Sequence, residues 1–204
     1  MLRKILIALL VIVVLVVGAA VYFLTRTPDL SAYERFLTPT IIKMPMQKVI
    51  VVEATGNPEE ISGTAIKLLY SLYYKIDGIP KFQSPPPAPR ARWPLPANTS
   101  KMIGRFALPV PDNVTALPRF EPPDKITVKL DDWEYGEVAQ ILHVGPYDDE
   151  KRTVERLQSY VKDLGYAIAG AHEEEYLRGP TMFGKGNPEK YYTLIRYPVQ
   201  PVAQ

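Results

Sequence analysis

Two stretches of the chain show the same order of apolar and polar positions. In the first, KVIVVEAT (Lys48–Thr55) is rich in β-branched residues, which favours a strand. Asn57 and Pro58 then supply a helix N-cap and a first-turn proline, and Asp77-Gly78 supplies a stop. The apolar side chains between them recur at helical spacing: Ile61, Ala65, Leu68, Leu72 and Ile76. The pattern predicts a strand followed by an amphipathic helix.

The second stretch begins with EVAQILHV (Glu137–Val144), which again reads as a strand. Gly145-Pro146-Tyr147 turns the chain into a helix whose first turn carries Asp149 and Glu150, as the helix dipole favours. Gly165 ends this helix. Its expected buried stripe consists of Val154, Leu157, Val161 and Leu164. Two further strands follow, one around 168–177 and one at 191–197.

A constant spacing of 89 residues relates the two stretches. It separates Gly56 from Gly145, Thr64 from Thr153, Leu68 from Leu157, and Pro109-Val110 from Pro198-Val199. One offset from the first strand to the last predicts a duplicated β-α-β-β unit without net insertion. We expect an α+β domain in which both helices cover one side of an antiparallel sheet.

The duplication sets the expected boundaries of the domain. We place it at 47–200, with repeat one at about 47–112 and repeat two at about 126–200. Two proline-rich stretches, at 80–96 and 108–125, are interpreted as stiff connections. The alternative for the first is a polyproline II ligand for an SH3-like partner.

The N-terminus is dominated by an uninterrupted apolar run from Ile5 to Leu24. At about 1.5 Å per residue such a run is long enough to cross a hydrocarbon core of about 30 Å. We therefore predict a transmembrane anchor at 1–26 and a juxtamembrane linker at 27–46. Arg3 and Lys4 precede the run, which places the N-terminus inside and the domain in the periplasm or outside the cell. A signal peptide cleaved near Ala19-Ala20 is the alternative.

Composition and charge exclude several classes of function. The net charge is +2 and the chain has no cysteine. No basic run with interleaved aromatic residues is present, so we expect no nucleic-acid partner. Without cysteine there is no disulfide framework and no thiolate metal site. His143 and His172 lie in different segments and are interpreted as ordinary structural histidines, so we predict no metal and no other cofactor.

The segment HEEEYLRGP (172–180) places three carboxylates in an expected strand. Side chains on a strand alternate between faces, so Glu174 and Tyr176 share one face while Glu173 and Glu175 share the other. We expect Glu173 and Glu175 to point into solvent.

The second repeat resembles the GyrI-like small-molecule-binding family, the effector-binding domain of AraC-type and MerR-type regulators. The resemblance rests on Gly145-Pro146-Tyr147, the amphipathic helix, Glu174-Glu175-Tyr176-Leu177, Thr193 and Pro198-Val199. Regulators of this kind carry a helix-turn-helix domain where this chain has its apolar run. Direct regulation of transcription is therefore not expected.

The resemblance implies two β-α-β-β units around a pseudo-two-fold axis, with an aromatic cleft between them. It also implies that a glutamate of a late strand, here Glu174, meets cationic or amphipathic ligands, with Tyr176 on the same face. Tyr147, Trp133 and Tyr135 are further candidates for lining the cleft. The offset of 89 makes Pro85 the counterpart of Glu174, so the site should be asymmetric.

Four functions follow from these observations. The first is a membrane-anchored binding module for small amphipathic or cationic molecules. The second is a hydrolase of reactive electrophiles that uses Glu174 with Tyr176 or Tyr147. The third, from the resemblance to SOUL-type proteins of the same duplicated architecture, is haem binding. The fourth is a structural role in which PPPAPR contacts a protein partner, whose identity stays open.

Overall fold

The computed structural model of the chain describes residues 10–15, 17–18, 30–79, 86–93, 102–180 and 186–202. The chain divides into two compact units, Met1–Ala32 and Tyr33–Gln204. In the first unit, residues 10–15 and 17–18 are helical. The greater part of the predicted anchor, residues 1–26, lies outside the described residues. Within the described residues, no helix has both the length and the apolar character to cross a membrane.

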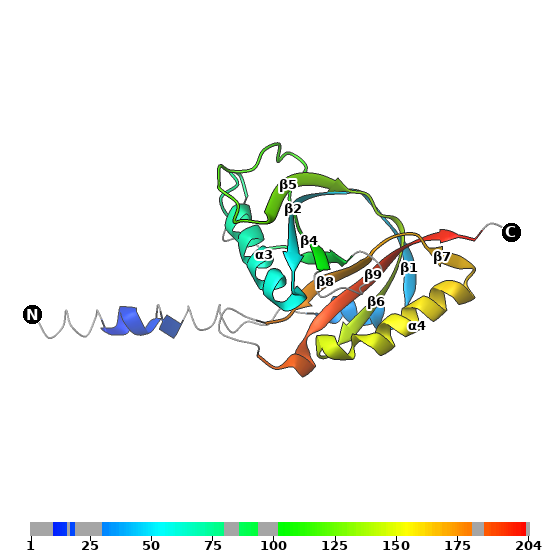
Figure 1. Ribbon diagram of the computed structural model, residues 1–204. Helices are drawn as coiled ribbons and strands as arrows, with labels where there is room; N and C mark the ends of the chain where they lie inside the picture. Colours follow the sequence, from blue (N-terminus) through cyan, green and yellow to red (C-terminus); the bar gives the residue numbers. More distant parts are fainter. Residues whose placement is uncertain are drawn as a thin grey trace, which may run out of the picture. The chain divides into compact units, whose positions relative to one another are not determined.

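The second unit follows the predicted order of strands and helices, with additions. In chain order the elements are α2 (Ser31–Glu34), η1 (Arg35–Leu37), β1 (Thr40–Met44), β2 (Gln47–Gly56), α3 (Pro58–Tyr73), β3 (Arg90–Trp93), β4 (Met102–Pro109), β5 (Ile126–Trp133), β6 (Gly136–Val144), η2 (Tyr147–Asp149), α4 (Glu150–Asp163), β7 (Tyr166–Ile168), β8 (His172–Arg178), η3 (Pro188–Lys190) and β9 (Tyr192–Pro201). The elements are shown in Figure 1. The repeated β-α-β-β order is confirmed: β2-α3-β3-β4 and then β6-α4-β8-β9.

The strands form one antiparallel sheet whose order reflects the duplication. In the described part of the chain the sheet has nine strands, in the order β1-β6-β9-β8-β3-β4-β2-β5, and β7 pairs with β9. The second strands of the two β-α-β-β units, β3 and β8, are neighbours in the middle of the sheet. This order reads the same from both ends, as the pseudo-two-fold relation requires.

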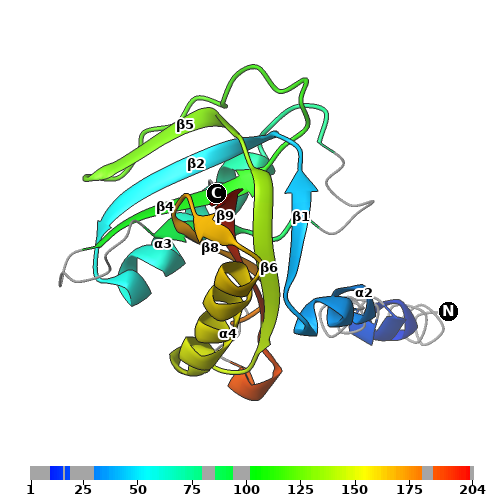
Figure 2. The same ribbon diagram turned by 90° about the vertical axis from the view of Figure 1, so that its right-hand side faces the viewer.

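The two edge strands are exchanged between the repeats. β1 precedes β2 in the chain but pairs with β6, and β5 precedes β6 but pairs with β2. Figure 2 shows β2 and β5 as long, curved strands lying side by side. β1 lies within 27–46, where the sequence predicted only a linker, so part of that segment belongs to the sheet.

Local sequence signals set the ends of the helices. The side chain of Asn57 accepts a hydrogen bond from the backbone N–H of Glu59 at 3.0 Å, which satisfies a free amide of the first turn of α3. Gly165, at a φ of 75°, follows the last turn of α4 as a left-handed residue. The predicted start of α3 at Asn57-Pro58 and the predicted end of α4 at Gly165 are thus confirmed. The end of α3, at Tyr73, comes four residues before the predicted stop at Asp77-Gly78.

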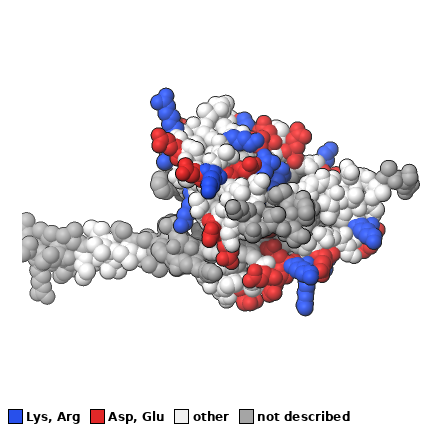
Figure 3. All heavy atoms as spheres, in the orientation of Figure 1, with Lys and Arg blue, Asp and Glu red and all other residues white. Residues whose placement is uncertain are grey.

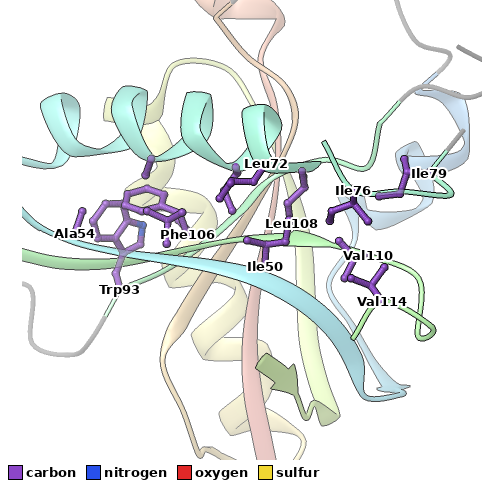
Figure 4. Packing of buried hydrophobic residues seen from close by; sticks show 14 residues of the cluster. Ile50, Ala54, Leu72, Ile76, Ile79, Trp93, Phe106, Leu108, Val110 and Val114 are labelled. Atoms are coloured by element: carbon purple, nitrogen blue, oxygen red, sulfur yellow. The ribbon is translucent and has the colours of Figure 1, made fainter. Parts of the chain in front are cut away.

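Both helices lie on the same face of the sheet. Residues directly opposite each other in an antiparallel pair share a face, and one row across the sheet runs Ile141, Ile195, Glu174, Ala91 and Phe106. Ile141 and Ile195 pack with Leu157 and Val161 of α4. Ala91 and Phe106 belong to the cluster that contains Leu69 and Leu72 of α3 (Figure 4). Glu174 therefore lies on the helix side of the sheet, between the parts that the two helices cover.

The stripe predicted for α4 is correct except at its end. Leu157 and Val161 are buried and Val154 is partly buried, but Leu164 is 52% exposed. Leu164 is the C-cap residue, so the backbone has already left the helical path there and its side chain no longer follows the stripe.

The second strands of the two units, β3 and β8, do not keep the offset of 89, contrary to our prediction of a repeat without net insertion. Glu174 pairs with Ile195, and Phe106, 89 residues before Ile195, pairs with Ala91. The structural counterpart of Glu174 is thus Ala91 instead of Pro85. Since alanine has no polar group, a site at Glu174 is asymmetric in this register too.

The prediction that the segment 80–96 is only a stiff connection is wrong. Arg90–Trp93 forms β3, which pairs with both β4 and β8 in the middle of the sheet. Ala91 and Trp93 are buried against α3, and the two arginines of RARW lie on the other face of the sheet. This alternation is typical of a strand, but the surrounding prolines made it hard to recognise in the sequence. Residues 80–85 and 94–96 lie outside the described residues.

Candidate functional site

The side chains of β8 separate onto the two faces of the sheet as the alternation predicted. His172, Glu174 and Tyr176 lie on the helix side, and Glu173 and Glu175 lie on the opposite face. However, Glu173 and Glu175 are only 1% and 7% exposed, so the prediction that they point into solvent is wrong. β8 is a central strand of a curved sheet, and both of its faces are covered.

Three arginines neutralise these two buried carboxylates. We call this set the arginine cluster: Arg90, Arg92, Arg196, Glu173, Glu175 and Tyr135. Arg196 pairs with Glu173 at 3.3 Å and with Glu175 at 2.5 Å. Arg90 lies 3.3 Å from Glu175, and Arg92 lies 2.8 Å from Glu173. Burial alone would raise the pKa of Glu175, but Arg196 and Arg90 outweigh it and hold the pKa below its ordinary value.

Tyr135 and Trp133 belong to this opposite face and do not share a site with Glu174. The Tyr135 hydroxyl accepts a hydrogen bond from Arg90 at 2.7 Å and donates one to Glu173 at 3.2 Å. The guanidinium of Arg92 stacks over the Trp133 ring at 3.8 Å. Burial, followed by the charge of Glu173, raises the pKa of Tyr135 to about 12. The sequence identified these aromatic residues as candidates but could not place them on a face.

On the helix side, Glu174 is the centre of a second group of polar and aromatic side chains. We call it the Glu174 cluster: Tyr147, Glu150, His172, Glu174, Tyr176, Tyr191 and Tyr197. One carboxylate oxygen of Glu174 accepts a hydrogen bond from the Tyr176 hydroxyl at 2.7 Å, and the other lies 2.9 Å from Nε2 of His172. The side chain of Glu174 is only 14% exposed. The structure thus brings together three of the predicted residues, Glu174, Tyr176 and Tyr147.

Aromatic rings surround this carboxylate. The Tyr147 ring packs edge-on against Tyr176, with 5.7 Å between ring centroids, and lies 5.2 Å from the Tyr191 ring. Tyr147 is 37% exposed, whereas Tyr191 is buried. A Cβ atom at Gly179 would lie 2.6 Å from the Tyr147 hydroxyl, so only glycine allows this tyrosine its position. Tyr147 is therefore the most accessible aromatic ring of the cluster.

The carboxylates of the Glu174 cluster have no lysine or arginine to balance them in the part of the chain that the structure describes. Among the ion pairs of the described residues, none joins Glu174 or Glu150 to a lysine or arginine. Burial, followed by repulsion from Glu174, raises the pKa of Glu150 to about 9. Burial and the charge of Glu174 likewise hold the pKa of Tyr176 well above its ordinary value. These side chains surround a site suited to a cation.

Sequence reasoning did not predict the other four members of the cluster, Glu150, His172, Tyr191 and Tyr197. Glu150 was read only as an acidic first-turn residue, and His172 as an ordinary structural histidine. In the structure, donor atoms of Glu150, His172 and Glu174 all lie within 4.8 Å of one another. Nδ1 of His172 lies 2.8 Å from the Tyr197 hydroxyl. His172 is two residues from Glu174, and this strand spacing was the one available signal that the two share a face.

The other histidine, His143, lies elsewhere on the helix side and both of its ring nitrogens have partners. Nδ1 lies 3.0 Å from the hydroxyl of Thr153 and Nε2 lies 3.0 Å from the carbonyl of Pro146. These contacts join β6 to the turn before α4 and to the first turns of that helix. The position agrees with the interpretation of His143 as a structural residue.

The face of the molecule seen in Figure 3 has no continuous basic region among the described residues. On the face shown in Figure 3, lysine and arginine side chains are scattered among aspartates and glutamates. This distribution agrees with the small net charge of +2.

Comparison with known proteins gives the same fold. A hydrolase from Listeria innocua has a TM-score of 0.65 and 22% identity over 86% of this chain and 100% of its own. An uncharacterized conserved protein from Listeria innocua has a TM-score of 0.66 and 24% identity over the same shares. The EcmrR C-terminal domain has a TM-score of 0.57 and 17% identity over 81% of this chain and 98% of its own.

At identities this low the structures show a shared fold and nothing further. No curated protein sequence matches the chain significantly. A family match is found for the part of the chain that contains β6, α4, β8 and β9, and with them the whole Glu174 cluster. Residues 105–200 match the GyrI-like small molecule binding domain.

Proposed function

We propose that this protein binds small amphipathic or cationic molecules at the Glu174 cluster. The observation that carries the proposal is the state of Glu174, a mostly buried carboxylate beside tyrosine rings, with no lysine or arginine partner among the described residues. A lipophilic cation would bury apolar area against the rings and place its charge beside the carboxylate in a site of low dielectric constant.

The two glutamates on the opposite face of β8 differ from Glu174 in their charge partners. Glu173 and Glu175 are as close to the middle of the sheet as Glu174, but arginines already neutralise them. A cationic ligand would gain nothing from those carboxylates without displacing a guanidinium. The match of residues 105–200 to a small-molecule-binding domain includes every residue of the Glu174 cluster, which agrees with this proposal.

Access to Glu174 depends on the aromatic side chains around it. Both oxygens of Glu174 have partners in Tyr176 and His172, and Tyr147 lies beside Tyr176. Tyr147 follows Pro146, at the start of α4, and is the exposed ring of the group. A ligand would meet Tyr147 first, and rotation of its ring would open the way to the carboxylate.

Replacement of Glu174 by glutamine tests the proposal. The change keeps the shape and the hydrogen bond from Tyr176 but removes the charge, so the affinity for the lipophilic cation rhodamine 6G should fall about 10- to 100-fold, or about 1.5–3 kcal/mol. Binding of the neutral dye Nile red should be unaffected. Fluorescence polarisation of both dyes measures the two affinities.

Glu155→Gln is the matched control, because Glu155 lies on α4 with its side chain 60% exposed and should not alter either affinity. Equal losses in Glu155→Gln and Glu174→Gln, or equal losses for both dyes, would mean that long-range charge or a folding defect explains the result. Absence of rhodamine 6G binding to the unmodified protein would count against cationic ligands altogether.

A hydrolase is the second candidate, and the contacts of Glu174 favour it. The carboxylate lies between an imidazole and a phenol, at 2.9 and 2.7 Å, and such a trio can orient a water molecule and return a proton to a leaving group. Incubation with a panel of electrophilic substrates separates the two functions. Turnover that vanishes in Glu174→Gln would support the enzyme, whereas binding without turnover would support the binding module.

We also propose that the N-terminal run attaches the protein to a membrane. The described apolar side chains of this segment, at Leu10–Leu15 and Val17, are each at least half exposed, and water is a poor environment for so many neighbouring apolar groups. Full-length protein should sediment with membranes, while a chain beginning at Thr27 should stay in the supernatant. A full-length product that is processed near Ala19-Ala20 and remains in the supernatant would identify a signal peptide.

The orientation follows from Arg3 and Lys4, which precede the run and favour a cytoplasmic N-terminus. The domain would then lie in the periplasm or outside the cell. Protease added to intact spheroplasts should digest it. Digestion only after lysis would reverse the orientation.

A further inference from the structure

The side chains of Glu150, His172 and Glu174 form a set of metal-type donors that the binding of organic cations does not require. An imidazole nitrogen and one oxygen from each of two carboxylates lie within 4.8 Å of one another. These residues come from the first turn of α4 and from β8, so the fold positions them from two separate elements. Imidazole with carboxylates is a donor set that zinc and similar divalent ions accept.

The spacing of the two β8 donors fits a shared ion. Donor atoms bound to one zinc, each about 2.0–2.2 Å from it, lie roughly 3–3.5 Å apart. Nε2 of His172 and Oε1 of Glu174 are 2.9 Å apart. An ion bound to both atoms would lie to one side of the line that joins them, and the two atoms would need to separate by no more than about 0.6 Å.

Each of these two donors is held by a further hydrogen bond, as metal ligands usually are. Nδ1 of His172 lies 2.8 Å from the Tyr197 hydroxyl, which can accept the ring proton once Nε2 binds a metal. The Tyr176 hydroxyl donates to Oε2 of Glu174 and leaves Oε1 directed at His172. The ring and the carboxylate are thus oriented before any ion arrives.

The third donor lacks a partner. Oε1 of Glu150 is buried and, among the described residues, has no hydrogen-bond partner; the Thr193 hydroxyl lies near but does not reach hydrogen-bonding geometry. A buried carboxylate oxygen without a partner is costly, particularly beside a second carboxylate. A divalent cation would satisfy this oxygen.

We propose that Glu150, His172 and Glu174 bind a divalent transition-metal ion, with zinc as the metal that fits best. Three protein ligands leave a fourth position for water or for a ligand atom, the arrangement of zinc sites that stay open to exchange. The proposal shares Glu174 with the proposed binding function but does not depend on it, because zinc binding requires no organic ligand.

The test uses the full chain, freed of metal with a chelator, and Zn²⁺ or Co²⁺ alone. Isothermal titration should show one Zn²⁺ per chain, and Co²⁺ should give the visible d–d absorption of a low-coordinate site. Glu150→Gln and His172→Asn should each weaken Zn²⁺ binding at least tenfold. Glu155→Gln on the exposed side of α4 should leave it unchanged.

Absence of Zn²⁺ uptake, or uptake that Glu150→Gln and His172→Asn leave unchanged, would overturn the proposal. Circular dichroism without metal checks that each variant folds, and Glu150→Gln alone decides the question if His172→Asn does not fold. Rhodamine 6G binding to metal-free Glu150→Gln separates the two proposals. If the dye binds in a Glu174-dependent manner while the unmodified chain takes up no Zn²⁺, only the metal site is refuted.

Discussion

Replacement of Arg196 by methionine should destabilise the domain by about 3–5 kcal/mol, since removal of one partner from a buried ion network leaves uncompensated charge. Arg196 is 5% exposed and joins both Glu173 and Glu175. It also donates a hydrogen bond to Gln140 at 3.1 Å. Methionine fills much of the same volume, so the loss should come from charge and hydrogen bonding. Urea unfolding at pH 7 measures the change in free energy.

Arg105→Met is the matched control on β4, which occupies in the first repeat the place that β9 occupies in the second. Arg105 is also paired, with Glu53 and Asp131, but its side chain is 38% exposed, and exposed pairs contribute only about 0–1 kcal/mol. If the loss in Arg196→Met comes from an unbalanced carboxylate, adding Glu175→Gln to it should recover part of the stability. A loss in Arg196→Met no larger than that in Arg105→Met would show that the arginine cluster is solvated.

Replacement of Leu157 by alanine should cost about 2–5 kcal/mol, the range for large-to-small changes in a well-packed core. Leu157 is fully buried and packs α4 against Ile141 and Ile195 of the sheet. Because α4 carries Glu150 and follows directly on Tyr147, looser docking of this helix should also weaken rhodamine 6G binding. Thermal unfolding and dye titration of the same samples measure both effects.

Leu164→Ala is the control for this prediction, because the sequence pattern assigns Leu157 and Leu164 to the same stripe. In the structure Leu164 is 52% exposed, so its replacement should change stability by no more than about 0.5 kcal/mol. Similar losses at the two positions would mean that the last turn of α4 is buried in solution and that the helix continues beyond Asp163.

Signals that act over short distances made the order of elements predictable. The N-cap at Asn57, the left-handed glycine at Gly165 and the apolar periods of the two helices are local, and each helix formed where they indicated. The offset of 89 residues extended this local information to the whole domain. It failed at β3 and β8, the second strands of the two units, where Ala91 replaces Pro85 as the counterpart of Glu174, because strand register depends on partners distant in sequence.

The exchange of the edge strands between the repeats likewise could not be predicted from local sequence signals. β1 has a short apolar pattern, TIIKM, that by itself fits a linker or a strand. Its pairing with β6 of the other repeat decides between the two, and no property of Thr40–Met44 identifies that partner. A strand of this length becomes stable only when a neighbouring strand satisfies its backbone hydrogen bonds.

By itself, the sequence determined that Glu174 and Tyr176 share a face and that Glu173 and Glu175 share the other, because strand alternation is a property of the backbone. Only the tertiary structure decided the environment of each face. Arginines from β3 and β9 converge on Glu173 and Glu175 and make burial of their charge possible. The helix side leaves Glu174 beside Glu150 and His172 without such a partner among the described residues. Charge compensation depends on which strands become neighbours, and that is settled only when the whole sheet forms.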